Sequence, residues 1–412
     1  MDKSKEIEQS LSGYSAIYRK ELLENVLPFW MQNSPDTEFG GYFNCLNRDG
    51  SVYDTDKFMW LQAREVWTFA TMYEKVEPNE QWLNMAKQGA EFILKHGRDN
   101  QGDWYFSLTR EGKPLTQPHS IFSDCFAAMA LSILDKNLPG NGYGEVALQT
   151  FEKILQRQEN PKGKYSKAYP STRPIKGFAL PMILSNLALE MEHILGKERV
   201  DAFIPEVIHE VMEVFYKPDL GLIVENVAPD GSLVDSFDGR LLNPGHAIEA
   251  MWFMMDLGER IQDDNLIKKA VDIAIREIEY GWDEKYGGIF YFLDRNDYPP
   301  QQLEWDQKLW WVHLEALVAM AKGYALTNDI RCYNWFVKLH DYTWARFRDT
   351  EFGEWYAYLN RQGEVLLPLK GGKWKCCFHV PRALLNIWKT MESIVEEKRS
   401  TCTVNSLTGT SR

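Results

Sequence analysis

The sequence predicts an all-α protein folded as an (α/α)6 barrel, with six helical hairpins and short β-hairpins gathered at one end. Three observations predict this fold class. A hairpin-like turn recurs along the chain, two helix-length segments separate most successive turns, and one segment of each pair is apolar on most of its faces. Because an all-apolar helix needs neighbours on every side, a ring of such helices inside a ring of amphipathic helices accommodates both kinds of segment.

The recurring turn is a short alternation of apolar and polar residues around a Gly or an Asp, as in GYFNCLNRDGSVY and WYFSLTREGKPL. Alternation on both sides of such a turn is typical of a β-hairpin. The turns fall at Gly50, Gly112, Gly231, Asp297 and Gly363. Their spacing is 62 to 66 residues, except for a gap of 119 residues that has a loop around Thr172 near its midpoint. The chain therefore contains six units of about 60 residues, one of them degenerate.

The segment after each hairpin is predicted to form the inner helix of its unit. SIFSDCFAAMALSILDK and EWDQKLWWVHLEALVAMAKGYA carry apolar residues with helical spacing on several faces. The other segment of a unit, such as NLIKKAVDIAIREIEYGW, has a charged face and is predicted to lie outside. We expect residues 1–398 to form a single barrel domain. The Ser/Thr-rich tail, residues 399–412, lacks apolar periodicity and is predicted to be disordered.

Composition limits the partners. A net charge of -13 over 412 residues argues against nucleic acid or an anionic membrane as the main partner. The chain has no uncharged apolar run of about 18 residues, and its N-terminus has no apolar signal-peptide core. Its six cysteines form no paired CxxC zinc pattern, which indicates a reduced, cytoplasmic protein. The 13% aromatic content suits a large core and also a carbohydrate cleft.

Unusual polar residues occupy equivalent places in four of the units. Arg64, His246, Glu315 and His379 follow their turns by 14 to 18 residues, near the start of the predicted inner helix. Any one of them alone is more often a hydrogen-bonded core residue than a site residue. Equivalent positions of different units converge at one end of a barrel, however, so the coincidence across four units favours one shared cavity.

Two prolines place the histidines more closely. Pro244 and Pro381 flank His246 and His379, and proline is favoured in the first turn of a helix. Both histidines are therefore expected near helix N-termini. The positive end of a helix favours a neutral imidazole and stabilises a developing anion.

Two further assignments follow from helical spacing. Glu249 lies three residues after His246 on the same helix face and is expected to orient the His246 ring. His313 and Glu315 are two residues apart, so they cannot both point into the cavity. We choose Glu315.

The residue set points to proton transfer. The chain has no spacing of His, Cys or carboxylate residues that demands a metal, no G-x-S-x-G elbow and no Walker or Rossmann glycine motif. Two neutral histidines, an arginine and carboxylates in an aromatic pocket suit removal of a proton beside a carbonyl. One histidine would remove the proton, the other would return it from the opposite face, and Arg64 would hold the enolate oxygen.

The same residues carry a family resemblance. The blocks WLQAREVW, SIFSDCFAAMA, NPGHAIEAMWF, QLEWDQKLWWVHLEA, FGEWYAYLNRQGEV and KGGKWKCCFHVPRA resemble the signature blocks of the N-acylglucosamine 2-epimerase family, its cyanobacterial members most of all. The match runs from roughly Leu22 to Ile387. It implies reversible interconversion of N-acetylglucosamine and N-acetylmannosamine, an (α/α)6 barrel and a homodimer. Mammalian relatives were also described as renin-binding proteins.

The resemblance also implies roles for the site residues. His246 and His379 match the acid/base pair of the family, Arg64 and Glu315 match its other essential residues, and Glu249 matches a supporting carboxylate. In one departure, Cys376 stands where relatives commonly have Gly before the residue that matches Cys377. This difference concerns local packing and oxidation.

The family binds ATP as an activator that is not consumed. The segment QRQENPKGKYSK resembles the region proposed for the nucleotide. Taken by itself this segment is a solvated basic turn, and it forms no P-loop. The resemblance places five residues near the nucleotide: Gly163, Lys164, Tyr165, Ser166 and Lys167.

Three other functions compete with this one. A sister epimerase or isomerase acting on cellobiose or mannose would use the same histidines, so only substrate assays separate it. A glycoside hydrolase needs two carboxylates flanking a glycosidic bond, whereas the convergent set here is mainly His and Arg. A non-catalytic protease-binding protein would leave the set of Arg64, His246 and His379 unexplained.

Overall fold

The structure, a computed structural model, describes residues 3–169 and 171–408. Its helices form two concentric rings, which confirms the predicted barrel. The inner ring consists of α3 (Met59–Lys75), α5 (Ile121–Asn137), α7 (Ala179–Glu190), α11 (Pro244–Ile261), α13 (Trp310–Thr327) and α15 (His379–Thr408). Their outer partners are α4 (Glu80–His96), α6 (Tyr143–Arg157), α9 (Lys197–His209), α12 (Asp264–Gly281), α14 (Ile330–Arg346) and, on α15, α1 (Lys3–Glu21).

The two kinds of helix are buried as their sequences require. Helix α5 is buried at nearly every position from Ile121 to Leu134, whereas α12 buries one apolar face and exposes its charges. Shorter helical segments complete the outer ring and the links. They are η1 (Leu22–Val26), α2 (Leu27–Asn33), η2 (Gly163–Tyr165), α8 (Glu192–Leu195), η3 (Glu210–Phe215) and α10 (Phe237–Arg240).

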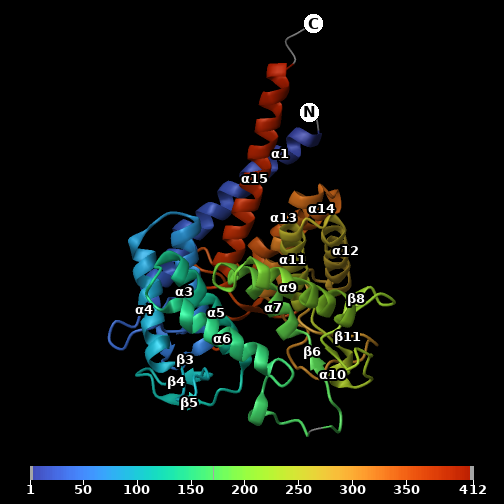
Figure 1. Ribbon diagram of the computed structural model, residues 1–412. Coiled ribbons are helices and arrows are strands. Elements are labelled where there is room, and N and C mark those ends of the chain that lie inside the picture. Colours follow the sequence, from blue (N-terminus) through green and yellow to red (C-terminus); the bar gives the residue numbers. More distant parts are fainter. Residues whose placement is uncertain (1–2, 170, 409–412) are drawn as a thin grey trace.

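The strands are short and lie at one end of the barrel, opposite the chain termini (Figure 1). All pairs are antiparallel. Two hydrogen-bonded groups have three strands: β3 (Lys57–Phe58), β4 (Ser107–Leu108) and β5 (Pro114–Thr116); β12 (Lys308–Leu309), β13 (Tyr358–Leu359) and β14 (Val365–Leu367). Four groups have two: β1 (Cys45–Leu46) with β2 (Val52–Asp54), β6 (Lys176–Gly177) with β9 (Asn226–Val227), β7 (Tyr216–Lys217) with β8 (Leu222–Ile223), and β10 (Leu241–Leu242) with β11 (Leu293–Asp294).

All five predicted turns have a left-handed residue. Gly50, Gly112 and Gly363 close the hairpins β1–β2, β4–β5 and β13–β14 with φ of 86°, 91° and 83°. Gly231 and Asp297 have φ of 81° and 60°, but there only the strand before the turn is paired, with a strand from another unit. The turns are therefore predicted correctly, and two of the hairpins are not.

A repeated ion-pair group shows that the ring closes. Buried Asp36 holds Lys57 at 2.9 Å and Arg110, from the next unit, at 3.0 Å. Asp349, in the last unit, receives the equivalent arginine from the first unit, with Arg48 at 2.8 Å. Equivalent groups are Asp283 with Lys308 and Arg361, and Asp349 with Lys370 and Arg48. The first and last units are thus joined by the same contact that joins neighbours along the chain.

The buried apolar side chains form one cluster that runs from Leu11 to Val395. Helix α15 continues past the predicted domain boundary at residue 399 and ends at Thr408. Residues 409–412 of the tail lie outside the described residues, and disorder of the tail stays a prediction. In the part of the chain that the structure describes, no helix is both long and apolar enough to cross a bilayer.

Candidate active site

A cavity with a volume of about 560 Å³ lies at the hairpin end of the barrel. Aromatic side chains make up much of its wall, among them Trp60, Phe126, Trp310, Trp311, Tyr358 and Trp374. Arg64, His246 and His379, predicted from the repeat spacing, also line it, as does Glu249, predicted from helical spacing. The fifth, Glu315, lies directly behind His379. The structure therefore brings all five together, from helices α3, α11, α13 and α15.

His246 stands in the first turn of α11, as Pro244 predicts. The side chain of Asn243 caps this helix by accepting the backbone N–H of His246 at 3.2 Å. The ring Nδ1 donates to Glu225, 2.9 Å from Oε1 and 3.2 Å from Oε2. Burial lowers the pKa of His246, but the charge and hydrogen bond of Glu225 outweigh this effect, so the pKa is raised above its usual value. The direction of this shift runs against the expectation of a neutral imidazole here, which took no account of Glu225.

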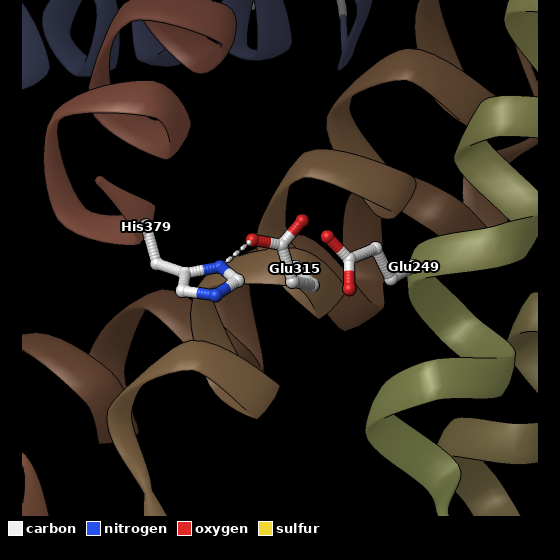
Figure 2. Close-up of side chains that lie close together, drawn as sticks. All are labelled: Glu249, Glu315 and His379. Atoms are coloured by element: carbon white, nitrogen blue, oxygen red, sulfur yellow. Dashed lines mark hydrogen bonds and ion pairs between the residues drawn. The ribbon is translucent and has the colours of Figure 1, made fainter. Parts of the chain in front are cut away.

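His379 is the first residue of α15. Its Nδ1 donates to Glu315 Oε1 at 2.7 Å, and Arg382 donates to the same oxygen at 2.7 Å. Figure 2 shows the His379 ring with the carboxylates of Glu315 and Glu249. Burial, reinforced by the positive charges of Arg64 and Arg382, holds the pKa of His379 well below its usual value. This imidazole is neutral, as expected.

Glu249 does not orient His246, contrary to the expectation from helical spacing. Its carboxylate forms an ion pair with Arg382 instead. Carboxylate and imidazole atoms of Glu249, Glu315 and His379 lie within 4.8 Å of one another, a grouping of the kind that can bind a metal ion (Figure 2). Here the Arg382 guanidinium contacts both carboxylates and supplies the positive charge between them.

His313 is part of the core. Its Nδ1 donates to the carbonyl of Leu309 at 2.7 Å, and its Nε2 accepts the backbone N–H of Ile289 at 2.9 Å. Burial lowers the pKa of His313 to about 3. The ring therefore bridges two backbone groups outside the cavity wall, while Glu315 faces His379.

Arg64 lies in an aromatic cage. Its guanidinium carbon is 3.9 Å from the ring centre of Phe126, 4.5 Å from Trp60 and 4.6 Å from Phe378. Among the described residues it forms no ion pair and no hydrogen bond. Burial lowers its pKa to about 10, so it remains charged at neutral pH. A buried cation at a cavity wall without a protein counter-ion is suited to bind an oxygen that becomes negative.

Trp311 contacts both histidines. Its ring centre is 5.4 Å from that of His246 and 5.8 Å from that of His379. In both rings Nδ1 is held by a carboxylate, and Nε2 has no hydrogen-bond partner in residues 3–169 and 171–408. A ring fixed through Nδ1 offers Nε2 for proton transfer. The cavity thus presents two oriented proton carriers.

The segment predicted to bind a nucleotide lies elsewhere. Gly163–Tyr165 forms the single turn η2 in the link between α6 and β6, and no residue from 163 to 167 lines the cavity. The Tyr165 hydroxyl donates to Gln117 at 3.2 Å. Lys164 and Lys167 are exposed and have no ion-pair partner among the described residues. The structure does not bring this segment together with the histidines.

Two residues of the site were not predicted. Arg382 lies three residues after His379 on the same helix, so the spacing rule applied to His246 would have found it. Glu225 is the only charge within the apolar strand segment LIVENV, 21 residues before His246. A carboxylate in such a segment is a signal of a buried partner, although the sequence does not show which one.

Sequence comparison places the chain among sugar epimerases. The family model described as N-acylglucosamine 2-epimerase (GlcNAc 2-epimerase) matches residues 41–383. The N-acylglucosamine 2-epimerase of Rattus norvegicus is 38% identical over 371 residues, 88% of each chain. That of Homo sapiens is 37% identical over 374 residues, 88% of this chain and 86% of its own. The cellobiose 2-epimerase of Bacteroides fragilis is 25% identical over 90% of this chain and 97% of its own.

Solved structures agree on the fold. The cellobiose 2-epimerase of Spirochaeta thermophila superposes with a TM-score of 0.80 at 19% identity, over 94% of this chain and 98% of its own. A D-mannose isomerase has a TM-score of 0.79 at 18% identity, over 91% and 98%. At these identities the likeness shows a shared fold alone.

Proposed function

Since the chain belongs to the N-acylglucosamine 2-epimerase family, we propose that it interconverts N-acetylglucosamine and N-acetylmannosamine by inverting carbon 2. The enzyme is an isomerase. One observation carries the proposal for its substrate chemistry: two histidines, each fixed through Nδ1 by a carboxylate, share one cavity with the unpaired cation of Arg64.

The chemistry begins with the open form of the sugar, because only the free aldehyde acidifies the hydrogen at carbon 2. The Nε2 atom of one histidine takes this hydrogen as a proton. The electron pair of the broken C–H bond moves into an enolate, whose oxygen Arg64 stabilises. The other histidine then protonates carbon 2 from the opposite face. This sequence inverts carbon 2 alone and leaves the sugar otherwise unchanged.

The carboxylates of the site do not suit glycoside hydrolysis. A hydrolase needs one carboxylic acid and one carboxylate free to act on a glycosidic bond. Glu249 and Glu315 are both bound by Arg382, and Glu315 also holds His379. A sister activity on cellobiose or mannose would use the same histidines, so the substrate itself must be tested.

We also propose that ATP activates the enzyme through residues 163–167. The exposed, unpaired Lys164 and Lys167 suit phosphate groups. A cavity of about 250 Å³ is lined by both flanks of the segment, including Pro161 and Lys176. At its far end the segment continues into β6, which pairs with β9 beside Glu225.

We propose a cytoplasmic homodimer. The five cysteines whose side chains are described are unpaired and buried, which suits a reducing compartment. The dimer follows from the family resemblance, and light scattering after gel filtration tests it by mass.

The substrate proposal is tested by incubating equal amounts of enzyme with N-acetylmannosamine, cellobiose and mannose, with and without ATP. Carbon NMR identifies each product. We expect N-acetylglucosamine from N-acetylmannosamine, at a rate lower by at least roughly 10²-fold in His246→Asn and in His379→Asn. Faster conversion of cellobiose or mannose would replace this substrate, and full activity in either variant would remove that histidine from the mechanism.

A further inference from the structure

The two histidines of the cavity have unlike carboxylate partners. Glu315, which holds His379, also contacts Arg382, so its negative charge is shared with a guanidinium. Glu225, which holds His246, forms no ion pair with any Lys or Arg of the described chain. No Lys or Arg side chain therefore shares the charge of Glu225 with the His246 ring.

The backbone holds Glu225 in place. Its carbonyl accepts the N–H of Phe178 at 2.9 Å, and its own N–H donates to the carbonyl of Leu241 at 3.3 Å. The side chain is only 15% exposed. A carboxylate fixed in this way keeps the hydrogen of its imidazole partner on Nδ1 and directs Nε2 away from itself.

The other charges near His246 do not cancel this effect. Glu249 adds a negative charge that also favours the protonated ring, although it is paired with Arg382 and forms no hydrogen bond to His246. Arg64 opposes protonation of His246 as a more distant charge, without a hydrogen bond to the ring. His379, the other imidazole packed on Trp311, is neutral. Tyr291 also packs on Trp311, and burial raises the pKa of its hydroxyl, so it is uncharged as well. Glu225 thus makes the strongest favourable contact to a protonated His246.

Resting on the proposed epimerase function, we propose that Glu225 is the positioning residue that keeps His246 protonated, so that the resting enzyme holds His246 as the acid and His379 as the base. In one turnover His379 Nε2 gains the proton from carbon 2, and the electrons of that C–H bond enter the enolate. His246 Nε2 then gives its proton to the other face of carbon 2. The enzyme ends with His379 charged and His246 neutral, and the reverse reaction or exchange with water restores the starting form.

The proposal predicts the pH dependence. The base must be deprotonated, so activity falls as the pH drops through the low pKa of His379. The acid must be protonated, so activity also falls as the pH rises through the raised pKa of His246. Removing the charge of Glu225 affects only the second of these limbs, because the Glu225 carboxylate contacts His246 and not His379.

The test uses Glu225→Gln, in which the amide oxygen can still accept from Nδ1 but carries no charge. Histidines labelled with ¹⁵N are titrated by NMR in the full-length enzyme, and His246 is assigned by the signal lost in His246→Asn. We expect the pKa of His246 to fall and the alkaline limb of kcat/KM to move to lower pH. We expect kcat to fall by about 10- to 100-fold, the loss typical for carboxylates that orient a metal-binding histidine in the same way. Glu225→Asp, which restores the charge, should recover part of both shifts.

Glu213→Gln is the matched control, because Glu213 holds the exposed His209 through the same Nδ1 contact at 3.0 Å, outside the cavity. It should leave activity and the titration of His246 unchanged. An unchanged titration of His246 in correctly folded Glu225→Gln overturns the role of Glu225. If wild-type enzyme does not interconvert amino sugars, the proposed function fails, and the NMR titration still decides whether Glu225 holds the charge of His246.

Discussion

Replacing Arg382 by methionine tests whether one guanidinium holds the two buried carboxylates of the site. Arg382 is 5% exposed, and its partners Glu249 and Glu315 are 4% and 0% exposed. Removing one partner of a buried ion pair costs about 3–5 kcal/mol, because the remaining charge has no compensation. An unfolding entropy of about 2.1 cal/mol/K per residue amounts to about 0.9 kcal/mol/K for 412 residues. The melting temperature should therefore fall by about 3–6 °C.

The same change acts on His379. The charge of Arg382 contributes to the lowered pKa of His379, so its loss raises that pKa. A larger fraction of the base is then protonated at a given pH, and the acid limb of the activity profile moves to higher pH. Calorimetry and the pH dependence of kcat/KM measure the two effects. Arg382→Lys, which keeps the charge, should retain the acid limb of the wild type. A methionine variant that melts with the wild type and keeps its acid limb would refute this account of the site.

Two further variants address the histidine outside the cavity wall and the nucleotide segment. His313→Gln should destabilise the protein by about 1–3 kcal/mol for each backbone group left unpaired, with an unchanged kcat for the folded enzyme. Burial lowers the folded pKa of His313 to about 3, whereas its unfolded pKa is about 6.5. Its contribution to stability is therefore present above the unfolded pKa and is lost as the pH falls. The melting temperature of the wild type should fall with pH for this reason, and the fall should be smaller in His313→Gln. Lys167→Ala should weaken activation by ATP with no change in melting temperature. The control Lys197→Ala, which removes an exposed lysine paired with Asp201, should leave activation by ATP unchanged. Equal ATP dependence in the two lysine variants would exclude the segment.

The repeat spacing predicted most of the architecture. A left-handed residue at each of Gly50, Gly112, Gly231 and Gly363 fixes a turn locally, so the turn is visible in the sequence. The helices between turns are long and strongly patterned, and their order follows from connectivity. The pairing of β6 with β9 was not predictable, because these strands lie far apart in the chain and pair only once the barrel has formed.

The site was predictable where a residue follows the repeat. Arg64, His246 and His379 occupy the start of inner helices, and the structure places all three at the cavity. Glu225 lies in a strand link and reaches His246 only through tertiary contacts. Its absence from the prediction explains why the raised pKa of His246 was not expected, since helix position alone favours the neutral ring.

The most direct test of the central claim, proton transfer at carbon 2 between two histidines, follows the hydrogen itself. N-acetylmannosamine is converted in deuterated water, and NMR measures deuterium at carbon 2 of substrate and product at low conversion. We expect N-acetylglucosamine to carry one deuterium there, because the protonating histidine has exchanged with the solvent, while unreacted N-acetylmannosamine still carries hydrogen. N-acetylglucosamine that keeps the hydrogen of the substrate at carbon 2 would contradict the two-histidine mechanism.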